Sequence, residues 1–155
     1  MSEMIAPRLE PVFRLSVEVA KPLEVGDIGW GERRVIDITG GTVSGPGGHG
    51  RILPGGADYQ IIRPGGLTEL RAHYTIELEG GVLVYIENLG IRFGAPEALA
   101  RIRRGEPVDP SEIYFRCTPR FETGSKDHAW LMTHIFLGVG VRRPTRVEVD
   151  VFKVA

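Results

Sequence analysis

Glycine and proline interrupt this chain so often that most of the pieces between them have only the length of a β-strand. The sequence has 21 Gly and 11 Pro among its 155 residues, spread along the chain rather than gathered in one tract. Glycine adopts the positive φ angles of tight turns, and proline neither continues a helix nor donates a backbone hydrogen bond. We therefore expect a single domain over residues 1–155 with many turns and a flexible segment at residues 1–8.

Alternation of apolar and polar residues predicts most of the strands. Residues 9–19 alternate in this way. Residues 67–78 and 82–93 form two further alternating runs, and the Glu79-Gly80-Gly81 sequence that joins them is typical of a β-hairpin. Other strand-length runs cover residues 33–39, 113–121, 130–141 and 145–154, and the first of these is expected to end at Gly40-Gly41.

One short helix is expected over residues 96–104. Pro96 suits a first helical turn, Glu97 suits the positive end of the helix, and Gly105 is a stop signal. About eight to ten strands with one helix that plugs or flanks an end predict an all-β fold, either a barrel or a sandwich. We favour a single antiparallel β-barrel, because closure of the sheet removes its exposed edges.

Charge and cysteine content argue against several kinds of partner. The formal net charge is −1 and the pI is near 6.4, so the chain has no excess of positive charge for nucleic acid or anionic lipid. The single cysteine, Cys117, excludes an intrachain disulfide and a cysteine metal cluster. We find no secretory signal and no run of about 18 apolar residues. The expected location is the cytoplasm, with no nucleic-acid or membrane partner.

The sequence predicts neither a metal nor a cofactor. Its four histidines lie on four separate segments without the short spacing of metal ligands: His49, His73, His128 and His134. The glycine-rich loop at residues 45–50 lacks the Lys-Ser or Lys-Thr of a phosphate-binding loop, and its glycines are better explained by turning and close backbone approach. Cys117 is interpreted as a buried, inert thiol, although neighbouring arginines would lower its pKa.

Polar residues in otherwise apolar strands mark the candidate site, because such groups are costly to bury without partners. We expect Asp58 or Glu122 to meet Arg116 inside the barrel, either as a structural ion pair or as an anchor for a carboxylate- or carbonyl-bearing ligand. Asp58 and Glu122 are also the candidate catalytic residues. The complete set of candidate ligand-binding residues is Asp58, Tyr74, Arg116, Glu122, Trp130 and His134.

The segments Gly55-Gly56-Ala57-Asp58 and Arg116-Cys117-Thr118-Pro119-Arg120-Phe121-Glu122-Thr123, followed by Trp130-Leu131, resemble the DUF3237 family, also labelled UPF0311. The resemblance runs from about residue 11 to 154. It implies a small cytoplasmic antiparallel β-barrel whose activity is unassigned. Met132 stands where the family often has asparagine, so a polar contact of that amide is missing or is supplied by His134. The residues that match the family pattern are Gly56, Asp58, Arg116, Phe121, Glu122 and Trp130.

Three functions remain open at this point. The first is a barrel that binds an oxygenated apolar metabolite. The second is a cofactor-free lyase, isomerase or cyclase, with Asp58 or Glu122 as general base and Arg116 stabilising an oxyanion. The third is a structural or oligomerising protein without a ligand site. Exposed strand edges would allow a homo-oligomer in each case.

Overall fold

The structure is a computed structural model and describes residues 2–155, so Met1 of the predicted flexible segment lies outside the described residues. It contains ten strands, one α-helix, α1 (Pro96–Arg103), and three 3-10 segments, η1 (Glu79–Gly81), η2 (Pro110–Glu112) and η3 (Lys126–Met132). The strands are β1 (Leu9–Val19), β2 (Leu23–Asp27), β3 (Glu32–Ser44), β4 (Gly50–Ile52), β5 (Gly56–Ile62), β6 (Thr68–Leu78), β7 (Val82–Gly94), β8 (Ile113–Glu122), β9 (Phe136–Arg142) and β10 (Arg146–Val154).

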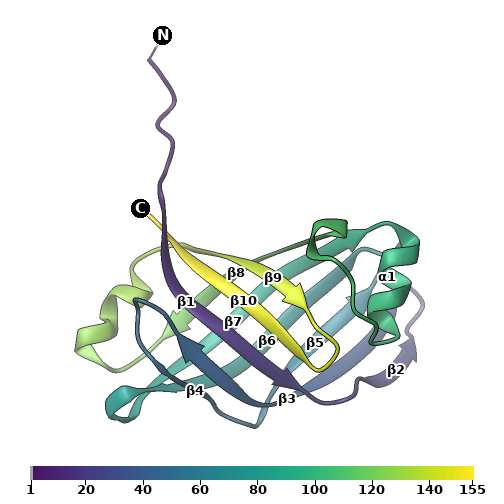
Figure 1. The fold of residues 1–155 in the computed structure, drawn as a ribbon, viewed down its shortest axis with the longest axis horizontal. Coiled ribbons are helices and arrows are strands. Elements are labelled where there is room, and N and C mark those ends of the chain that lie inside the picture. Colours follow the sequence, from purple (N-terminus) through teal and green to yellow (C-terminus); the bar gives the residue numbers. More distant parts are fainter. Residues whose placement is uncertain (1) are drawn as a thin grey trace.

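The strands form a closed antiparallel β-barrel (Figure 1). Closure occurs at β1, which pairs with β10 on one side and with β3 on the other. Eight strand positions make the wall, because β4 and β5 follow one another in a single position between β3 and β6. Strand β2 pairs with β3 outside this ring. The predicted all-β barrel with one short helix is therefore confirmed.

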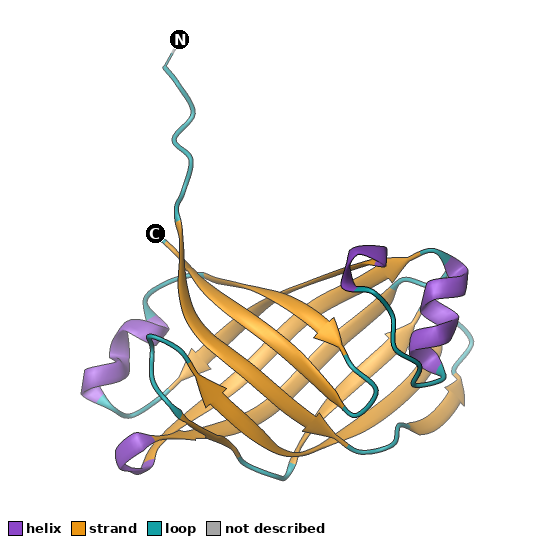
Figure 2. Ribbon diagram, viewed as in Figure 1, coloured by secondary structure: helices purple, strands orange, loops and turns teal. Residues whose placement is uncertain are grey.

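The helical segments lie at the two ends of the barrel (Figure 2). At one end, which we call the helix end, α1 follows β7 and leads through η2 into β8. At the other end, which we call the cap end, η3 connects β8 to β9. The helix thus flanks one end of the barrel, as its length and position predict. The helices that the structure describes in residues 2–155 are too short or too polar to cross a membrane.

Strand β3 continues through Gly40-Gly41 to Ser44, so the expectation that it ends at these glycines is wrong. The reason is the close approach of β1 and β3, whose backbones pair at this point. A Cβ atom on Gly41 would lie 2.0 Å from the carbonyl oxygen of Ser16, and Gly41 has a φ of 139°. Glycine is needed here to let two strands meet, and it does not mark a turn.

The segment at residues 130–141 is divided in the structure, so the expectation of one continuous strand there is wrong. Trp130 belongs to η3, and β9 begins at Phe136. Local hydrogen bonds account for the helical turn, because the backbone N–H and the hydroxyl of Thr133 both donate to the carbonyl oxygen of Trp130. Side-chain bonds of this kind compete with strand pairing.

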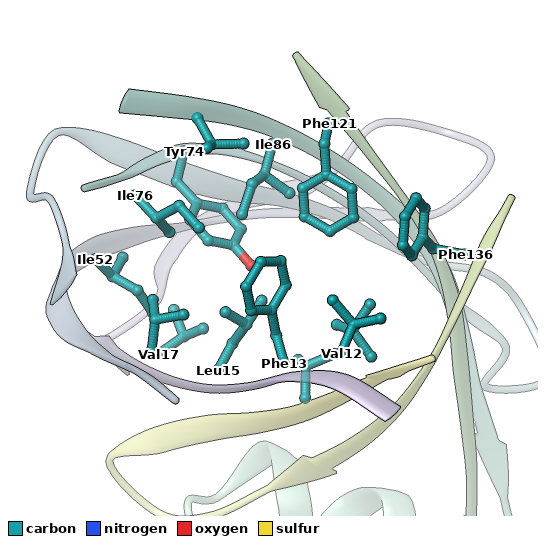
Figure 3. Packing of buried hydrophobic residues seen from close by; sticks show 14 of the residues in the cluster. Val12, Phe13, Leu15, Val17, Ile52, Tyr74, Ile76, Ile86, Phe121 and Phe136 are labelled. Atoms are coloured by element: carbon teal, nitrogen blue, oxygen red, sulfur yellow. The ribbon is translucent and has the colours of Figure 1, made fainter. Parts of the chain in front are cut away.

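Buried hydrophobic side chains pack together inside the barrel (Figure 3), and their cluster extends to the cap end. Phe121 makes edge-to-face contacts with Phe13 and Phe136, at ring-centroid distances of 5.8 and 4.9 Å. Leu131 of η3 is 1% exposed and belongs to the same cluster. Because aliphatic and aromatic side chains close this end, any internal site must lie toward the helix end.

Residues 2–7 precede the first strand and project away from the barrel (Figure 1). Pairing begins at Arg8, whose backbone exchanges two hydrogen bonds of 2.8 Å with Ala155. Met4 and Ile5 are almost fully exposed. We call residues 2–7 the N-terminal arm.

Candidate functional site

The inward faces of the central strands change from apolar to polar between the cap end and the helix end. On β7 the inward positions are Val84 and Ile86, followed by Asn88, Gly90 and Arg92, because alternate residues of a strand share one face. Polar side chains also lie on the adjoining part of the barrel wall. Asp58 and Gln60 of β5 pair with Ala72 and Leu70 of β6, and Ala72 pairs in turn with Asn88.

Several polar atoms in this region are buried without a hydrogen-bond partner in the part of the chain that the structure describes. They include the Asp58 Oδ1, Tyr74 Oη and Asn88 Oδ1 atoms. Gln60 Nε2 donates a hydrogen bond to Asp58 Oδ2 at 2.8 Å. The Oε1 atom of the same side chain has no partner among the described residues. A buried polar atom without a partner costs about 1–3 kcal/mol. A cluster of such atoms is therefore typical of a place that receives another molecule.

The electrostatic environment favours the neutral forms of the acid and the phenol. Burial raises the pKa of Asp58 above its ordinary value, although the Gln60 hydrogen bond and the positive charge of Arg92 oppose this shift. Burial also raises the pKa of Tyr74, whose side chain points into the barrel (Figure 3) and is 3% exposed. The Tyr74 hydroxyl is thus available as a hydrogen-bond donor at neutral pH, and the Asp58 carboxyl becomes a donor when it is protonated.

Two spaces lie near these atoms. The interior cavity has a volume of about 50 Å³ and is lined by residues that include Asp58, Tyr74 and Asn88. A larger space of about 370 Å³, which we call the mouth pocket, opens at the helix end and is lined by parts of β3, β7, β9 and α1. Val19 borders both spaces. The mouth pocket and the interior cavity therefore adjoin at Val19.

Three arginines project from the barrel wall into the mouth pocket: Arg34, Arg92 and Arg142. Arg34 is 4% exposed and forms an ion pair with Glu24 at 3.0 Å. Arg92 is 3% exposed, and within residues 2–155 its Nε and Nη1 atoms have no hydrogen-bond partner. Burial lowers the pKa of Arg92 to about 10, so the guanidinium stays charged at neutral pH.

Arg92 lies between the mouth pocket and the interior cavity. Its guanidinium carbon is 5.6 Å from the ring centroid of Phe115, which lines the interior cavity. A cation held over an aromatic face is stabilised by about 0.5–2 kcal/mol, less than the cost of burying an unpaired charge. The Nε and Nη1 atoms of Arg92, which have no partner within the described residues, remain able to donate hydrogen bonds to another group.

Helix α1 forms one side of the mouth pocket. Ala98 and Ile102 are buried against Val108, which anchors the helix to the segment that follows it. Arg103 of the helix forms ion pairs with Glu24 and Glu32 of β2 and β3. The helix is therefore held across the opening by hydrocarbon contacts and by charge pairs with the adjoining strands.

The expected inward placement of Arg116 and Glu122 is wrong. Strand β8 directs Phe115, Cys117 and Phe121 inward, so the residues between them face outward. Arg116 donates to the carbonyl oxygen of Phe115 and lies 5.1 Å from the Tyr114 ring centroid on the outer surface. The structure therefore does not bring either residue to Asp58.

Trp130 and His134 also lie away from the polar interior. Trp130 is partly buried at the cap end, where it packs on Phe136 and on the core. His134 is exposed beyond η3, and its Nδ1 atom donates to the carbonyl oxygen of Trp130 at 2.9 Å. Met132, which stands where the family pattern has an amide, is exposed beside them. Of the candidate residues, only Asp58 and Tyr74 line the interior cavity.

Cys117 lines the interior cavity as a buried thiol, in agreement with the sequence interpretation. Burial raises its pKa to about 11 and outweighs the effect of Arg116. Gly90 and Gly138 leave room for it, since a Cβ on Gly138 would lie 2.4 Å from the sulfur atom. Among residues 2–155, no three His, Cys, Asp or Glu side chains gather closely enough to hold a metal ion.

A broad depression of about 1090 Å³ covers part of the outer surface and includes Arg116. Its walls carry exposed apolar side chains such as Ile91 and Tyr114, and Arg63 in it is paired with Glu69 at 2.7 Å. Small-molecule sites are enclosed and have convergent polar groups. By that criterion the mouth pocket with the interior cavity is the better candidate, although the outer depression is larger.

The closed sheet, the polar interior and the opening beside α1 define a small β-barrel protein with an internal cavity. The chain belongs to the DUF3237 family, described as proteins of unknown function, whose model matches residues 7–154. A UPF0311 protein of Rhodopseudomonas palustris is 49% identical over 152 residues, which cover 97% of this chain and 99% of that protein. The family predicted from sequence is confirmed.

Solved structures show the same fold. The crystal structure of the Rhodopseudomonas palustris protein, described as conserved and of unknown function, has a TM-score of 0.93 and covers 98% of this chain and all of that one, at 47% identity. A β-barrel-like protein of Acinetobacter baumannii has a TM-score of 0.86 at 36% identity, with 100% of both chains covered. An enzyme from Penicillium herquei has a TM-score of 0.75 at 16% identity, covering 100% of this chain and 99% of that one, and this likeness shows the fold alone.

Proposed function

We propose that this protein binds a small oxygen-bearing metabolite in the mouth pocket and interior cavity. The observation that carries the proposal is the set of buried polar atoms around the cavity that lack partners within the described residues, those of Asp58, Tyr74 and Asn88. Hydrogen bonds from a ligand would satisfy these atoms and recover the cost of their burial. The single buried cysteine is compatible with action in the cytoplasm.

The sizes of the two spaces determine how such a ligand would lie. A volume of about 50 Å³ holds only one or two water molecules, at about 30 Å³ each in the liquid. The mouth pocket, at about 370 Å³, is within the range of small-molecule sites, which begins at about 300 Å³. The body of the ligand therefore occupies the mouth pocket, and one oxygen-bearing group reaches the interior cavity.

Removing the hydroxyl of Tyr74 tests this binding mode. We expect Tyr74→Phe to leave the free energy of unfolding unchanged or slightly higher, because the hydroxyl has no partner among residues 2–155. The same change should weaken retention of a co-purified ligand by about tenfold, the loss of about one hydrogen bond. Native mass spectrometry of the purified protein measures the retained small molecule, and urea titration measures stability.

Tyr85→Phe is the matched control, because Tyr85 lies on the outer surface and its hydroxyl contacts His73 Nδ1 at 2.6 Å. It should leave ligand retention unchanged. Equal retention by wild type and Tyr74→Phe would argue against the proposed site, and so would equal loss in both variants.

A cofactor-free enzyme on the same site is the second candidate function. The favouring observation is Asp58, whose Oδ1 atom has no partner in the described chain and whose pKa is raised by burial. A carboxyl group tuned toward neutral pH is suited to general acid–base catalysis, and Arg92 would stabilise a developing oxyanion. The fold is compatible with catalysis, since the distant Penicillium herquei protein is described as an enzyme.

We further propose that the outer surface pairs with a second copy of the chain. Exposed apolar side chains gather on adjoining strands there and form a patch, which we call the outer patch: Leu89, Ile91, Phe93, Tyr114 and Leu137. Large exposed apolar patches are typical of protein interfaces. The N-terminal arm carries Met4 and Ile5 away from its own barrel, and Leu9, which follows the arm, lines the depression that contains most of the patch. In a dimer, the exposed apolar side chains of the N-terminal arm would pack against the barrel of the second copy.

Light scattering coupled to size-exclusion chromatography checks this pairing. Wild type should elute as a dimer, and Ile91→Glu on the outer patch should elute as a monomer, because a charge in an apolar contact is costly. Val25→Glu, at an exposed position of β2, should remain a dimer. A monomeric wild-type protein at the highest attainable concentration would rule the pairing out.

A further inference from the structure

The walls of the mouth pocket carry far more positive than negative charge. One carboxylate, that of Glu24, lines the pocket, against six cationic side chains: Lys21, Arg34, Arg92, Arg103, Arg104 and Arg142. Some of this charge is compensated, because Glu24 pairs with Arg34 and Arg103, and Glu106 outside the pocket pairs with Arg104. The cations that lack such an ion pair therefore indicate what the pocket can bind.

Arg92 and Arg142 form no ion pair with a carboxylate anywhere in residues 2–155. Arg142 is half-buried, and its Nη1 atom makes a long hydrogen bond of 3.3 Å to the carbonyl oxygen of Arg146. Arg92 is more deeply buried, with two nitrogen atoms unpartnered in the described chain. A buried guanidinium without an anion is unfavourable, so the pocket is arranged for an anion that it does not itself supply.

The arginines also act on one another. Burial lowers the pKa of Arg92 and of Arg142 most, the negative charge of Asp58 opposes both shifts, and the positive charge of Arg34 lowers both pKa values further. Asp58, the acidic residue on the interior side, forms its side-chain hydrogen bond with Gln60 and makes no ion pair with any of the three arginines. An incoming negative charge would reduce this repulsion.

We propose that the mouth pocket binds an oxyanion, a carboxylate or a phosphate group of the ligand, and that Arg92 and Arg142 hold it. The planar guanidinium donates two parallel hydrogen bonds to either group, which suits both chemistries. This inference rests on the proposed ligand site and adds the chemical class of its ligand: a molecule with an oxyanion in the mouth pocket and a further oxygen-bearing group toward Asp58 and Tyr74.

Titration with matched small probes tests the inference. Benzoate and benzamide have nearly the same shape but differ in charge, and inorganic phosphate distinguishes a phosphate from a carboxylate. We expect benzoate or phosphate to shift the backbone amide NMR signals of residues lining the mouth pocket, such as Ile36 and Thr145, in a saturable manner. Benzamide should bind at least tenfold more weakly than benzoate. Preferential binding of phosphate would assign that group, and preferential binding of benzoate would assign a carboxylate.

Three variants locate the binding. Arg92→Gln and Arg142→Gln should each weaken the favoured anion by at least tenfold, and Arg142→Gln keeps the test informative if the more buried Arg92 is required for folding. Arg116→Gln is the control, because Arg116 is exposed in the outer depression and should not affect the affinity.

The outcomes separate this inference from the proposed ligand site. Equal affinity for benzoate and benzamide, with signal shifts in the mouth pocket, would overturn the anion assignment and leave the ligand site standing. Unchanged affinity in both Arg92→Gln and Arg142→Gln would do the same. Shifts confined to the outer depression and abolished by Arg116→Gln, or no saturable shifts with any probe, would overturn both proposals.

Discussion

Asp58→Asn is expected to stabilise the barrel at neutral pH and to leave its stability unchanged in acid. The native-state pKa of Asp58 is raised by burial, so the folded protein holds this proton more tightly than the unfolded chain does. The contribution of Asp58 to the stability of wild type is therefore fully present below the unfolded-state pKa of about 4 and is lost as the pH rises through the native-state value. The asparagine variant lacks this loss.

The difference in stability should be about 1.4 kcal/mol for each pH unit by which the native-state pKa exceeds the unfolded-state value. Urea denaturation measured at intervals from roughly pH 4 to pH 8 covers the expected titration of a buried carboxyl. Asp37→Asn, at an exposed position on β3, is the control, and its free energy of unfolding should depend on pH as that of wild type does. Parallel stability curves for wild type and Asp58→Asn would contradict the raised pKa.

The same variant distinguishes a binding protein from an enzyme. If the barrel is an enzyme, Asp58→Asn should abolish turnover of the bound metabolite while binding is retained, because an amide cannot exchange the proton. Glu122→Gln should retain turnover, since Glu122 lies on the outer surface beside Thr123. Turnover that persists in Asp58→Asn would remove the acid–base role.

Phe121→Ala is expected to lower the free energy of unfolding by about 3–5 kcal/mol. Phe121 is 4% exposed and makes edge-to-face contacts with Phe13 and Phe136, so truncation removes buried hydrocarbon and leaves a cavity at the cap end. A loss of this size is a large part of the 5–15 kcal/mol that typically stabilises a domain. Thermal and urea denaturation both measure it.

Arg120→Ala on the same strand is the control, because its side chain is exposed on the outer surface and lies outside the outer patch. It should change the free energy of unfolding by less than about 1 kcal/mol. A similarly small effect for Phe121→Ala would mean that the cap end is not closely packed.

Sequence periodicity predicted the barrel wall well, because alternate residues of a strand must point to opposite faces. The hairpin of β6 and β7, strand β1 and helix α1 all lie within one or two residues of their expected bounds. Tyr74 was placed on the inward face by the same rule. The failures occurred where local contacts overrule alternation: at Gly41, where two strands approach closely, and at Trp130, where hydrogen bonds form a 3-10 turn.

The candidate site was predicted only in part. Alternation on β8 places Arg116 with Glu122 on the face opposite to Phe115, which is the inward one, and this signal was present in the sequence. The signal for Arg92 was present as well, since it continues the face of Ile86 and Asn88. What sequence did not show was that Arg34 of β3 and Arg142 of β9, far apart in the chain, open into the same pocket as Arg92.

Residue order alone was enough to predict most of the strands and the alternation of faces along them, because alternation is a property of a single strand, and the motifs were enough to predict the family. Tertiary structure alone decided which end of the barrel is filled with hydrocarbon and which arginines converge beside α1. Convergence depends on how β1 closes the sheet between β10 and β3, and the residues that pair β1 with β10 are more than a hundred positions apart. No local pattern specifies such a pairing, since the energy that favours it is shared among all the side chains that the closed barrel buries.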